Sequence, residues 1–336
     1  MSQKSAITSE PRPISLVIPT WNGGPLFHTV LEALAAQDIE GGFQLVVIDS
    51  GSSDGTREAA EAAGALVQSI EQSEFNHGGT RNRAIELSSG ERICLLTQDA
   101  RPMNAAYVRN LVRPFDDDAI DGVYARQFPR ADCDPLLAER LRRWSATRET
   151  PEIKSLVPGD ALASIAAYDR LPPLERYLSS VFDNVASAVR RSTWQRLNFP
   201  MRPFGEDVAW GRQILRAGGT LAFEPTAEVE HSHRIKMFRE FKRIYCDHKN
   251  LFELFELRNV PDWSCVRNGA RGQWRFYREL LDGVAIGPMA RFYWKTYALP
   301  YAYLETAAQF LGARSKWKTT ESALWRWADR KIRAGV

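Results

Sequence analysis

The sequence predicts an α/β protein with a mixed, mostly parallel β-sheet flanked by helices and a helical C-terminal extension. Over residues 14–97, short apolar runs rich in β-branched residues alternate with segments of helical spacing. Each apolar run ends in a polar turn, as strands that lead into helices do. Strands joined in this way lie parallel and carry helices on both faces of the sheet. After about residue 235 the strand pattern stops, and the chain becomes basic, aromatic and helical.

The pattern assigns an element to most of the first 231 residues. The early strands are expected at 14–19, 44–49, 65–70 and 92–97, with helices at 25–37, 54–64 and 79–89. Asp54 can cap the second helix, and Gly64 can end it. The later elements are expected as helices at 104–115, 134–148 and 206–217, a loop at 150–160, a buried strand at 185–190 and a proline-containing edge strand at 221–231.

Length and composition define three regions. The chain has 336 residues, enough for one large domain with an appendage. We expect a flexible terminus over 1–12, the α/β domain over 13–235 and the helical region over 236–336. A net charge of only +3 gives no reason to expect a nucleic-acid partner.

The cysteines and the apolar runs predict a cytoplasmic location. The four cysteines form no CxxC pair, which is typical of free thiols in a reducing compartment. Residues 1–13 contain no apolar stretch of the kind found in secretory signals. No run approaches the roughly 20 apolar residues that a spanning helix needs.

Polar residues follow three of the predicted strands, at positions 20–22, 49–51 and 98–100. Ligands of such sheets bind at the carboxyl ends of the strands, so these turns are the first candidate site. Asp49 can accept hydrogen bonds from a nucleotide base or ribose, whereas Asp54 suits a helix cap better. Asp99 can hold Mg²⁺ or Mn²⁺ together with substrate phosphates. It can equally be an ordinary strand-end carboxylate.

Two further groups of side chains suit catalysis or metal binding. Glu206 and Asp207 open a helix, where the helix dipole stabilises acidic side chains. One of the two can also act as a general base. His231 and His233 alternate on one face of a strand, where either can ligate Mn²⁺ or be structural.

The stretch FNHGGTRN, at residues 75–82, leads into a helix with Arg81 in its first turn. Backbone N–H groups at a helix start bind phosphate, although the same sequence can be a plain helix entry. It is not a Walker loop, and no GxGxxG follows the first strand.

Together these stretches resemble the family 2 glycosyltransferases, which have the GT-A fold. The resemblance covers about residues 14–233 and rests on ISLVIPTWNGG, LVVIDSGSSDGT, FNHGGTRNRAIELSSGE, LLTQDARP, FGEDVAWGRQIL and HSH. Within the family, the FNHGGTRN and TQDA segments are most similar to bacterial rhamnosyltransferases that use dTDP-L-rhamnose.

The resemblance implies roles at the donor side of the site. The donor-binding set would be Thr20, Asn22, Asp49, Gly51, His77, Gly78, Arg81, Thr97 and Gln98. Residues 97–99 stand where the family has Asp-x-Asp, with Thr97 in place of the first aspartate. Asp99 would then be the metal carboxylate. His233, or with less support His231, would be the distal metal ligand.

The resemblance also implies the chemistry. Asp207 would be the catalytic base, with Glu206 beside it positioning the acceptor. The reaction would be an inverting sugar transfer, dependent on Mg²⁺ or Mn²⁺, from a dTDP- or UDP-type donor. The acceptor would be a saccharide or lipid-linked saccharide in cell-surface polysaccharide synthesis.

Two other functions compete with this one. A sugar-phosphate nucleotidyltransferase needs a cationic glycine-rich loop after the first strand, and residues 20–25 contain no cation. A non-catalytic nucleotide-sugar sensor or scaffold is compatible with Thr97, but Asp99 and the Glu206–Asp207 pair argue against it.

The basic and aromatic residues after 236 suit peripheral contact with the inner face of the cell membrane. They suit equally a helical cap on the catalytic domain or a homodimer interface.

Overall fold

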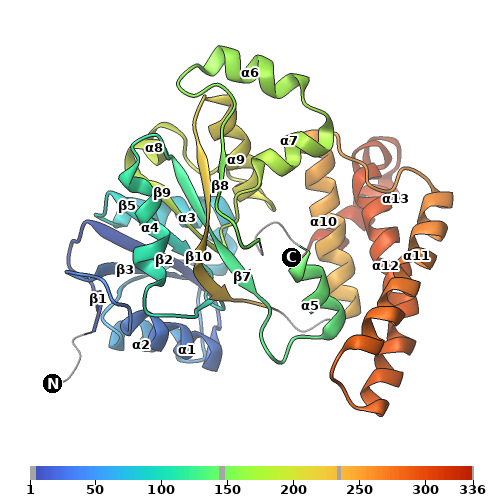
Figure 1. Ribbon diagram of the computed structural model, residues 1–336, viewed down its shortest axis with the longest axis horizontal. Coiled ribbons are helices and arrows are strands. Elements are labelled where there is room, and N and C mark those ends of the chain that lie inside the picture. The colour runs from blue at the N-terminus through green and yellow to red at the C-terminus, as the bar shows by residue number, and fades with distance from the viewer. Residues whose placement is uncertain (1–4, 144–147, 233–235, 335–336) are drawn as a thin grey trace. The chain divides into compact units, whose positions relative to one another are not determined.

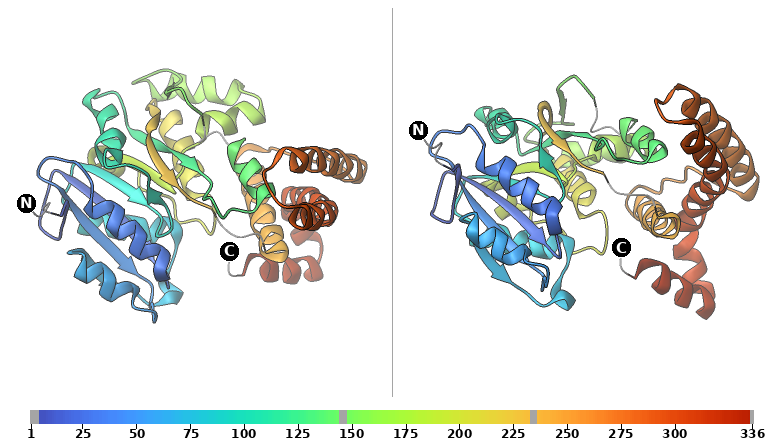
Figure 2. Two further views of the ribbon diagram at one scale, coloured as in Figure 1. Left: turned by 60° about the horizontal axis from the view of Figure 1, so that its bottom comes forward. Right: turned by 90° about the horizontal axis from the view of Figure 1, so that it is seen from below.

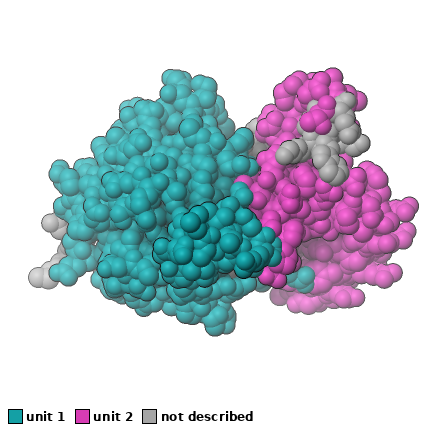
Figure 3. All heavy atoms as spheres, turned by 90° about the horizontal axis from the view of Figure 1, so that it is seen from above, with its two compact units in different colours: residues 1–131, 141–171, 178–232 teal, residues 132–140, 172–177, 233–336 magenta. Residues whose placement is uncertain are grey.

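The computed structural model describes residues 5–143, 148–232 and 236–334 (Figure 1). The chain divides into two compact units, drawn in two colours in Figure 3. Unit 1 comprises residues 1–131, 141–171 and 178–232, and unit 2 comprises 132–140, 172–177 and 233–336. The sequence predicts one boundary near residue 235. Two short earlier segments also group with the C-terminal helices.

The described part of unit 1 contains a ten-stranded sheet in the order β1-β3-β2-β5-β9-β7-β10-β6, in which β4 also pairs with β3 and β8 with β10. The strands are β1 (Ile7–Thr8), β2 (Ile14–Thr20), β3 (Phe43–Asp49), β4 (Leu66–Ser69), β5 (Arg92–Leu96), β6 (Arg101–Pro102), β7 (Gly122–Phe128), β8 (Glu152–Lys154), β9 (Ala186–Arg190) and β10 (Leu221–Glu230).

The sheet is mixed, as the sequence predicts. Strand β2 pairs in parallel with β3 and with β5. Strand β9 runs antiparallel to both β5 and β7, so direction reverses in the middle of the sheet. This reversal brings the amino end of β9 beside the carboxyl end of β5, where Leu96 pairs with Ala186.

Helices cover both faces of the sheet. The helices of unit 1 are α1 (Gly24–Ala35), α2 (Thr56–Ala62), α3 (His77–Leu87), α4 (Tyr107–Val112), α6 (Ala161–Arg170), α8 (Arg191–Arg196) and α9 (Glu206–Arg216), with 3₁₀ turns η1 (Gln72–Glu74) and η2 (Arg113–Asp116). Apolar residues of α1, α2 and α4 share one buried cluster with alternate residues of β2 and β3, such as Leu16 and Leu45. Helix α3 packs against β2 and β3, and α9 against α3. Figure 2 shows the blue helices α1 and α2 side by side.

The predicted edge position of residues 221–231 is wrong. Strand β10 pairs with β7 on one side, and on the other with β8 at Leu221–Phe223 and with β6 at Val229–Glu230. The register with β7 shifts between Glu224 and Glu228, which is where Pro225 lies. A proline cannot donate to a ladder, so an interior strand accommodates it at such a bulge.

Two other expectations need adjustment. The predicted loop over 150–160 contains the short strand β8. The predicted helix over 134–148 is shorter, because α5 spans Pro135–Arg142 and residues 144–147 lie outside the described part of the chain.

Unit 2 is helical, as expected for its C-terminal part. Its helices are α10 (Met237–Phe255), α11 (Trp263–Gly283), α12 (Pro288–Glu321) and α13 (Ala323–Arg333), and α5 and α7 (Pro173–Ser180) begin in its two short segments. Helix α12 packs against α10, α11 and α13. A Cβ at Gly312 would lie 2.4 Å from the carbonyl oxygen of Tyr245, so only glycine allows α12 to approach α10 this closely.

Buried contacts hold the helices of unit 2 together. Tyr277, Ala298 and Tyr301 form an apolar cluster with Leu136 of α5. Asp329 of α13 accepts hydrogen bonds from Tyr245 Oη, at 2.8 Å, and from Lys249 Nζ, at 2.9 Å. Of the helices in the described residues, none combines the length and apolarity needed to cross a bilayer.

Candidate active site

The carboxyl ends of β2, β3 and β5 meet, as predicted for parallel strands. Thr20 Oγ1 donates to Asp49 Oδ1 at 3.0 Å, which joins β2 to β3. Gln98 lies just after β5, and its Oε1 accepts from Trp21 N at 2.8 Å while its Nε2 donates to Trp21 O at 3.1 Å. The three polar turns therefore form one edge of the sheet.

Asp49 organises the turn that follows β3. Besides Thr20, its carboxylate accepts hydrogen bonds from Gly51 N at 3.1 Å, Ser52 N at 2.9 Å and Ser52 Oγ at 2.5 Å. The residue is 2% exposed. A carboxylate has about four lone-pair sites, and four protein donors use them. Asp49 thus shapes the turn, and Gly51 adopts the φ of +80° that the turn requires.

The turn after β2 is locked to the same loop. Ser52 Oγ accepts from Asn22 N at 2.8 Å, and Asn22 Oδ1 accepts from Ser53 N at 2.9 Å. Asn22 has a φ of 45°, a left-handed conformation that asparagine tolerates. Beside it Trp21 is 49% exposed, an aromatic surface that sequence reasoning passed over although it stands in the predicted turn.

The N-cap of α2 is Gly55 and not the predicted Asp54, which lies one residue earlier and still accepts hydrogen bonds from the first turn of the helix. Its Oδ1 accepts from Thr56 N at 3.1 Å and Thr56 Oγ1 at 2.6 Å at the start of α2, and its Oδ2 accepts from Gly24 N at 2.9 Å. The hydroxyl of Thr56 is the main cause of a lowered pKa for this carboxyl group. The carboxylate therefore joins the starts of α1 and α2.

Packing explains much of the stretch FNHGGTRN at the start of α3. Asn76 caps the helix by accepting from Gly79 N at 3.0 Å. A Cβ at Gly78 would lie 2.2 Å from Pro200 O, so the glycine allows α3 to approach the 199–202 segment. The imidazole of His77 meets Phe75 edge-on at 4.9 Å, and burial lowers the pKa of His77.

Arg81 points into the protein and pairs with Glu206. Its Nη1 lies 3.0 Å from Glu206 Oε1, and the two side chains are 5% and 7% exposed. The same Nη1 donates to His77 O at 3.0 Å. The guanidinium, predicted to touch the diphosphate, and the Glu206 carboxylate, predicted to position the acceptor, thus contact each other across α3 and α9.

Asp207 follows Glu206 in the first turn of α9 and is only partly buried. Its Oδ1 accepts from Val208 N at 2.7 Å and its Oδ2 from Asn184 N at 3.3 Å. Burial, followed by the negative charges of Glu206 and Asp183, raises the pKa of Asp207 well above its usual value, against the opposing effects of Val208 N–H and Arg81. A carboxylate with a raised pKa accepts a proton more readily, which is what a general base needs.

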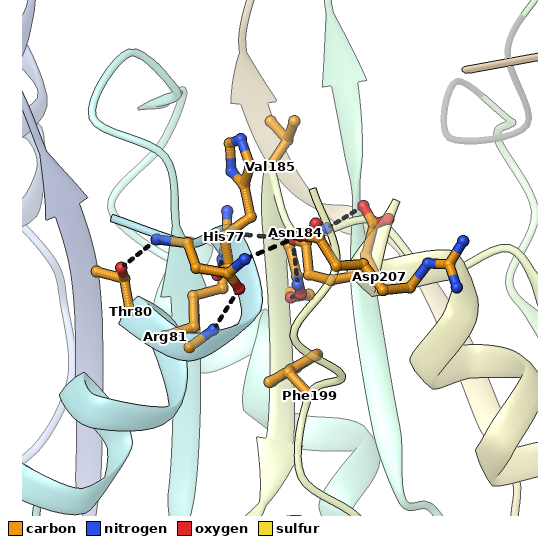
Figure 4. A network of polar contacts seen from close by, with 12 residues as sticks. His77, Thr80, Arg81, Asn184, Val185, Phe199 and Asp207 are labelled. Carbon is orange, nitrogen blue, oxygen red and sulfur yellow. Dashed lines mark hydrogen bonds and ion pairs between the residues drawn. The ribbon is translucent and has the colours of Figure 1, made fainter. Parts of the chain in front are cut away.

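Asn184 connects the two acidic residues, and sequence reasoning missed it. It is 1% exposed, and its Nδ2 donates to Glu206 Oε1 at 3.3 Å while its backbone N–H donates to Asp207. Figure 4 draws Arg81, Asn184 and Asp207 within one network of polar contacts. The signal was the polar pair Asp183–Asn184 before a buried strand, but its relevance depends on β9 being antiparallel.

The end of β5 holds the predicted metal carboxylate. Asp99 Oδ2 lies 3.6 Å from Nε2 of His231, which follows β10. Thr97 N donates to Val185 O at 3.0 Å, and within the described residues the buried Thr97 Oγ1 has no hydrogen-bond partner. His233 lies outside the described residues.

The described residues contain no group of three or more His, Cys, Asp or Glu side chains arranged to hold a metal ion. A carboxylate and an imidazole at the end of β5 fit a cation that takes its other ligands from phosphates and water.

Known proteins that are similar to this chain are glycosyltransferases. The model of the family described as glycosyl transferase family 2 matches residues 15–168. The O-antigen chain rhamnosyltransferase RfbN of Salmonella typhimurium is 35% identical over 236 residues, which are 69% of this chain and 70% of that protein. The O-antigen chain rhamnosyltransferase WbaN of Salmonella anatum is 29% identical over 235 residues, with the same coverage of 69% and 70%.

Among solved structures, glucosyl-3-phosphoglycerate synthase of Mycobacterium tuberculosis is 21% identical, with a TM-score of 0.49 and coverage of 75% of this chain and 81% of that one. The sequence match to RfbN spans more than two thirds of each protein. Together with the family model, this match shows that the chain is a glycosyltransferase and belongs to glycosyl transferase family 2.

Proposed function

We propose that this protein is an inverting rhamnosyltransferase that moves L-rhamnose from dTDP-L-rhamnose to a saccharide or lipid-linked saccharide in cell-surface polysaccharide synthesis. The observation that carries the chemistry is the partly exposed Asp207, with its raised pKa, at the start of α9. The donor sugar is supported by the two relatives, which are named O-antigen chain rhamnosyltransferases.

Asp207 acts as the general base. The acceptor hydroxyl gives its proton to the Asp207 carboxylate as its oxygen attacks C1 of the sugar. The bond between C1 and the phosphate oxygen breaks, and the nucleoside diphosphate leaves with the electron pair. One displacement from the face opposite the leaving group inverts the configuration at C1.

Glu206 and Asn184 position Asp207. The Glu206 carboxylate is buried and faces Arg81, so it acts through its charge and not by touching the acceptor. That charge raises the pKa of Asp207, while the backbone N–H of Asn184 orients the Asp207 carboxylate. The raised pKa increases the driving force for proton transfer from a hydroxyl.

The donor binds at the joined ends of β2, β3 and β5. Asp49 holds the turn there, and the exposed parts of Trp21, Asn22 and Ser53 form its surface. Gln98 fixes the backbone of Trp21 in this surface. We assign base and ribose binding to these turns, with Asp49 contributing through the shape of its loop.

Asp99 and His231 would hold Mg²⁺ or Mn²⁺. The 3.6 Å between Asp99 Oδ2 and His231 Nε2 supports His231 over the sequence-based preference for His233. When bound, such a cation stabilises the negative charge that develops on the departing diphosphate. A single carboxylate with one imidazole suits a cation that takes its remaining ligands from phosphates and water.

A thermal-shift series tests the donor assignment. The protein is heated with dTDP, UDP, GDP and their sugar conjugates, each with and without Mn²⁺. We expect the largest rise in melting temperature with dTDP and dTDP-L-rhamnose, and only when Mn²⁺ is present. A rise specific to UDP would overturn the rhamnose assignment, and no rise with any nucleotide would overturn the donor site.

A further inference from the structure

We propose that one face of unit 2 docks on the surface of an anionic lipid bilayer. This docking face consists of exposed residues of α11 and α12, namely Arg267, Arg271, Arg275, Arg278, Met289, Phe292, Tyr293, Leu299 and Tyr303. The inference goes beyond the proposed function, because it concerns where the enzyme binds and uses no step of the transfer.

The first half of α12 is apolar on two opposite sides. One side is buried in unit 2 through Ala298, Tyr301 and Ala302. The other side carries Met289 and Phe292, which are 88% and 76% exposed.

The exposed apolar residues of α12 follow one another at helical spacing. From Met289, the steps to Phe292, Tyr293, Leu299 and Tyr303 are three, four, ten and fourteen residues, so they form one continuous stripe. A helix that is apolar all round is normally buried all round. The outward stripe therefore needs a cover that the described residues do not supply.

A row of arginines runs along α11. Arg267, Arg271 and Arg275 are spaced by four residues and are exposed, and Arg278 continues the row. The buried side of α11 carries Val266, Ala270 and Tyr277. The row therefore stands on the flank of α11, away from its packing side.

An ion pair shows that this flank borders the apolar stripe of α12. Asp282, four residues after Arg278 on the same flank, pairs with Lys295 of α12 at 2.5 Å. Lys295 lies three residues after Phe292 and four before Leu299, at the margin of the stripe. Glu279 and Asp282 are the acidic residues of α11, so the four arginines and Lys295 leave the face cationic.

The combination identifies the occupant as a membrane surface. A helix lying in a membrane interface buries apolar and aromatic side chains at headgroup depth and places cations against anionic headgroups. Tyrosine is enriched at this depth because its ring is apolar and its hydroxyl is polar. A two-fold interface between copies of this chain would instead bring both arginine rows into one buried contact, where like charges repel.

Flotation with lipid vesicles tests the proposal on the full chain. One set of vesicles contains phosphatidylcholine alone, and the other also contains phosphatidylglycerol. Binding is measured at about 0.15 M and about 1 M salt, between which the Debye length falls from roughly 8 to 3 Å. We expect flotation with the anionic vesicles, and its loss at high salt.

Two double variants separate the contributions of the face. Met289→Ser/Phe292→Ser removes apolar contact, and Arg271→Glu/Arg275→Glu reverses charge. The control Arg57→Glu/Arg170→Glu makes the same change in net charge at exposed sites of unit 1. We expect the vesicle partition coefficient to fall at least tenfold in both docking-face variants and to stay within twofold of wild type in the control.

The proposal is overturned if binding ignores lipid charge and salt, or if the control loses as much binding as the docking-face variants. It is also overturned if the chain is a dimer that Met289→Ser/Phe292→Ser dissociates while vesicles bind neither protein. All variants are expected to keep the wild-type melting temperature and dTDP-induced shift. Loss of vesicle binding is therefore distinguishable from failure of the donor site.

Discussion

Arg81 and Glu206 form a buried ion pair, with 3.0 Å between Nη1 and Oε1, that links α3 to the first turn of α9. The pair is adjacent to Asp207, and both of its charges act on the pKa of that residue in opposite directions. A contact between two helices thereby tunes the proposed base.

Removing one member of this pair should destabilise the protein strongly. Arg81→Met leaves the Glu206 carboxylate buried without its cation, a change that typically costs about 3–5 kcal/mol. The double variant Arg81→Met/Glu206→Gln should recover part of that loss, because no unpaired buried charge remains. Denaturant unfolding measures the free energy of unfolding of both variants. A loss below about 1 kcal/mol in Arg81→Met would show that the ion pair contributes little to stability.

The pH dependence of transfer should report Asp207. The base works when deprotonated, so a raised pKa means that the rate rises with pH through that pKa and is lost below it. Burial is the largest cause of the raised pKa of Asp207; the charges of Glu206 and Asp183 also raise this pKa, whereas the Val208 N–H and Arg81 lower it.

In Glu206→Gln one raising charge is absent, so the acidic limb of the rate profile should move to lower pH. The matched comparison is Asp118→Asn, a change at a fully exposed aspartate, which should leave the profile in place. If the acidic limb of the pH–rate profile does not move in Glu206→Gln, the profile does not report the ionisation of Asp207.

Neighbouring glycines in α3 should respond differently to alanine. At Gly78 the new Cβ would lie 2.2 Å from Pro200 O, a backbone atom that cannot move cheaply. Gly78→Ala should cost about 1–3 kcal/mol, as overpacking does. At Gly79 the nearest atom is Met201 Cε at 3.4 Å, so Gly79→Ala should be neutral or slightly stabilising. Equal losses of unfolding free energy in the two variants would mean that α3 does not approach the 199–202 segment closely.

Metal binding should depend on Asp99 and His231. Titration of Mn²⁺, followed by the electron paramagnetic resonance of the free ion with dTDP present, should show at least tenfold weaker binding in Asp99→Asn and His231→Ala. We expect His233→Ala to bind like wild type. If His233→Ala weakens Mn²⁺ binding and His231→Ala does not, His233 is the ligand, as the sequence suggests. Unchanged Mn²⁺ binding in Asp99→Asn would show that Asp99 does not hold the metal.

The sequence predicted those parts of the site that follow from parallel strands. Apolar runs locate β2, β3 and β5, and parallel pairing brings their carboxyl ends together, so Thr20, Asp49 and Gln98 were expected at one edge. Residue type alone did not reveal their partners. Asp49 is used within its own turn, which depends on hydrogen-bond geometry.

The sequence pattern does not predict strand direction or long-range packing. An apolar run does not reveal whether a strand is antiparallel, and β9 had to be antiparallel for Asn184 to reach Glu206 and Asp207. The ion pair of Arg81 spans 125 residues of sequence. The proline of β10 suggested an edge, but a bulge allows it inside the sheet.

Asp207 is proposed to be the base in sugar transfer from dTDP-L-rhamnose. The most direct test of this role is the transfer of labelled rhamnose from that donor to the lipid-linked saccharides of a membrane fraction from the source organism, with wild type and Asp207→Asn compared. We predict that Asp207→Asn lowers transfer by about 10²–10⁴-fold, the usual contribution of a general base, while its affinity for dTDP stays within twofold of wild type. Wild-type turnover by Asp207→Asn would show that Asp207 is not the base.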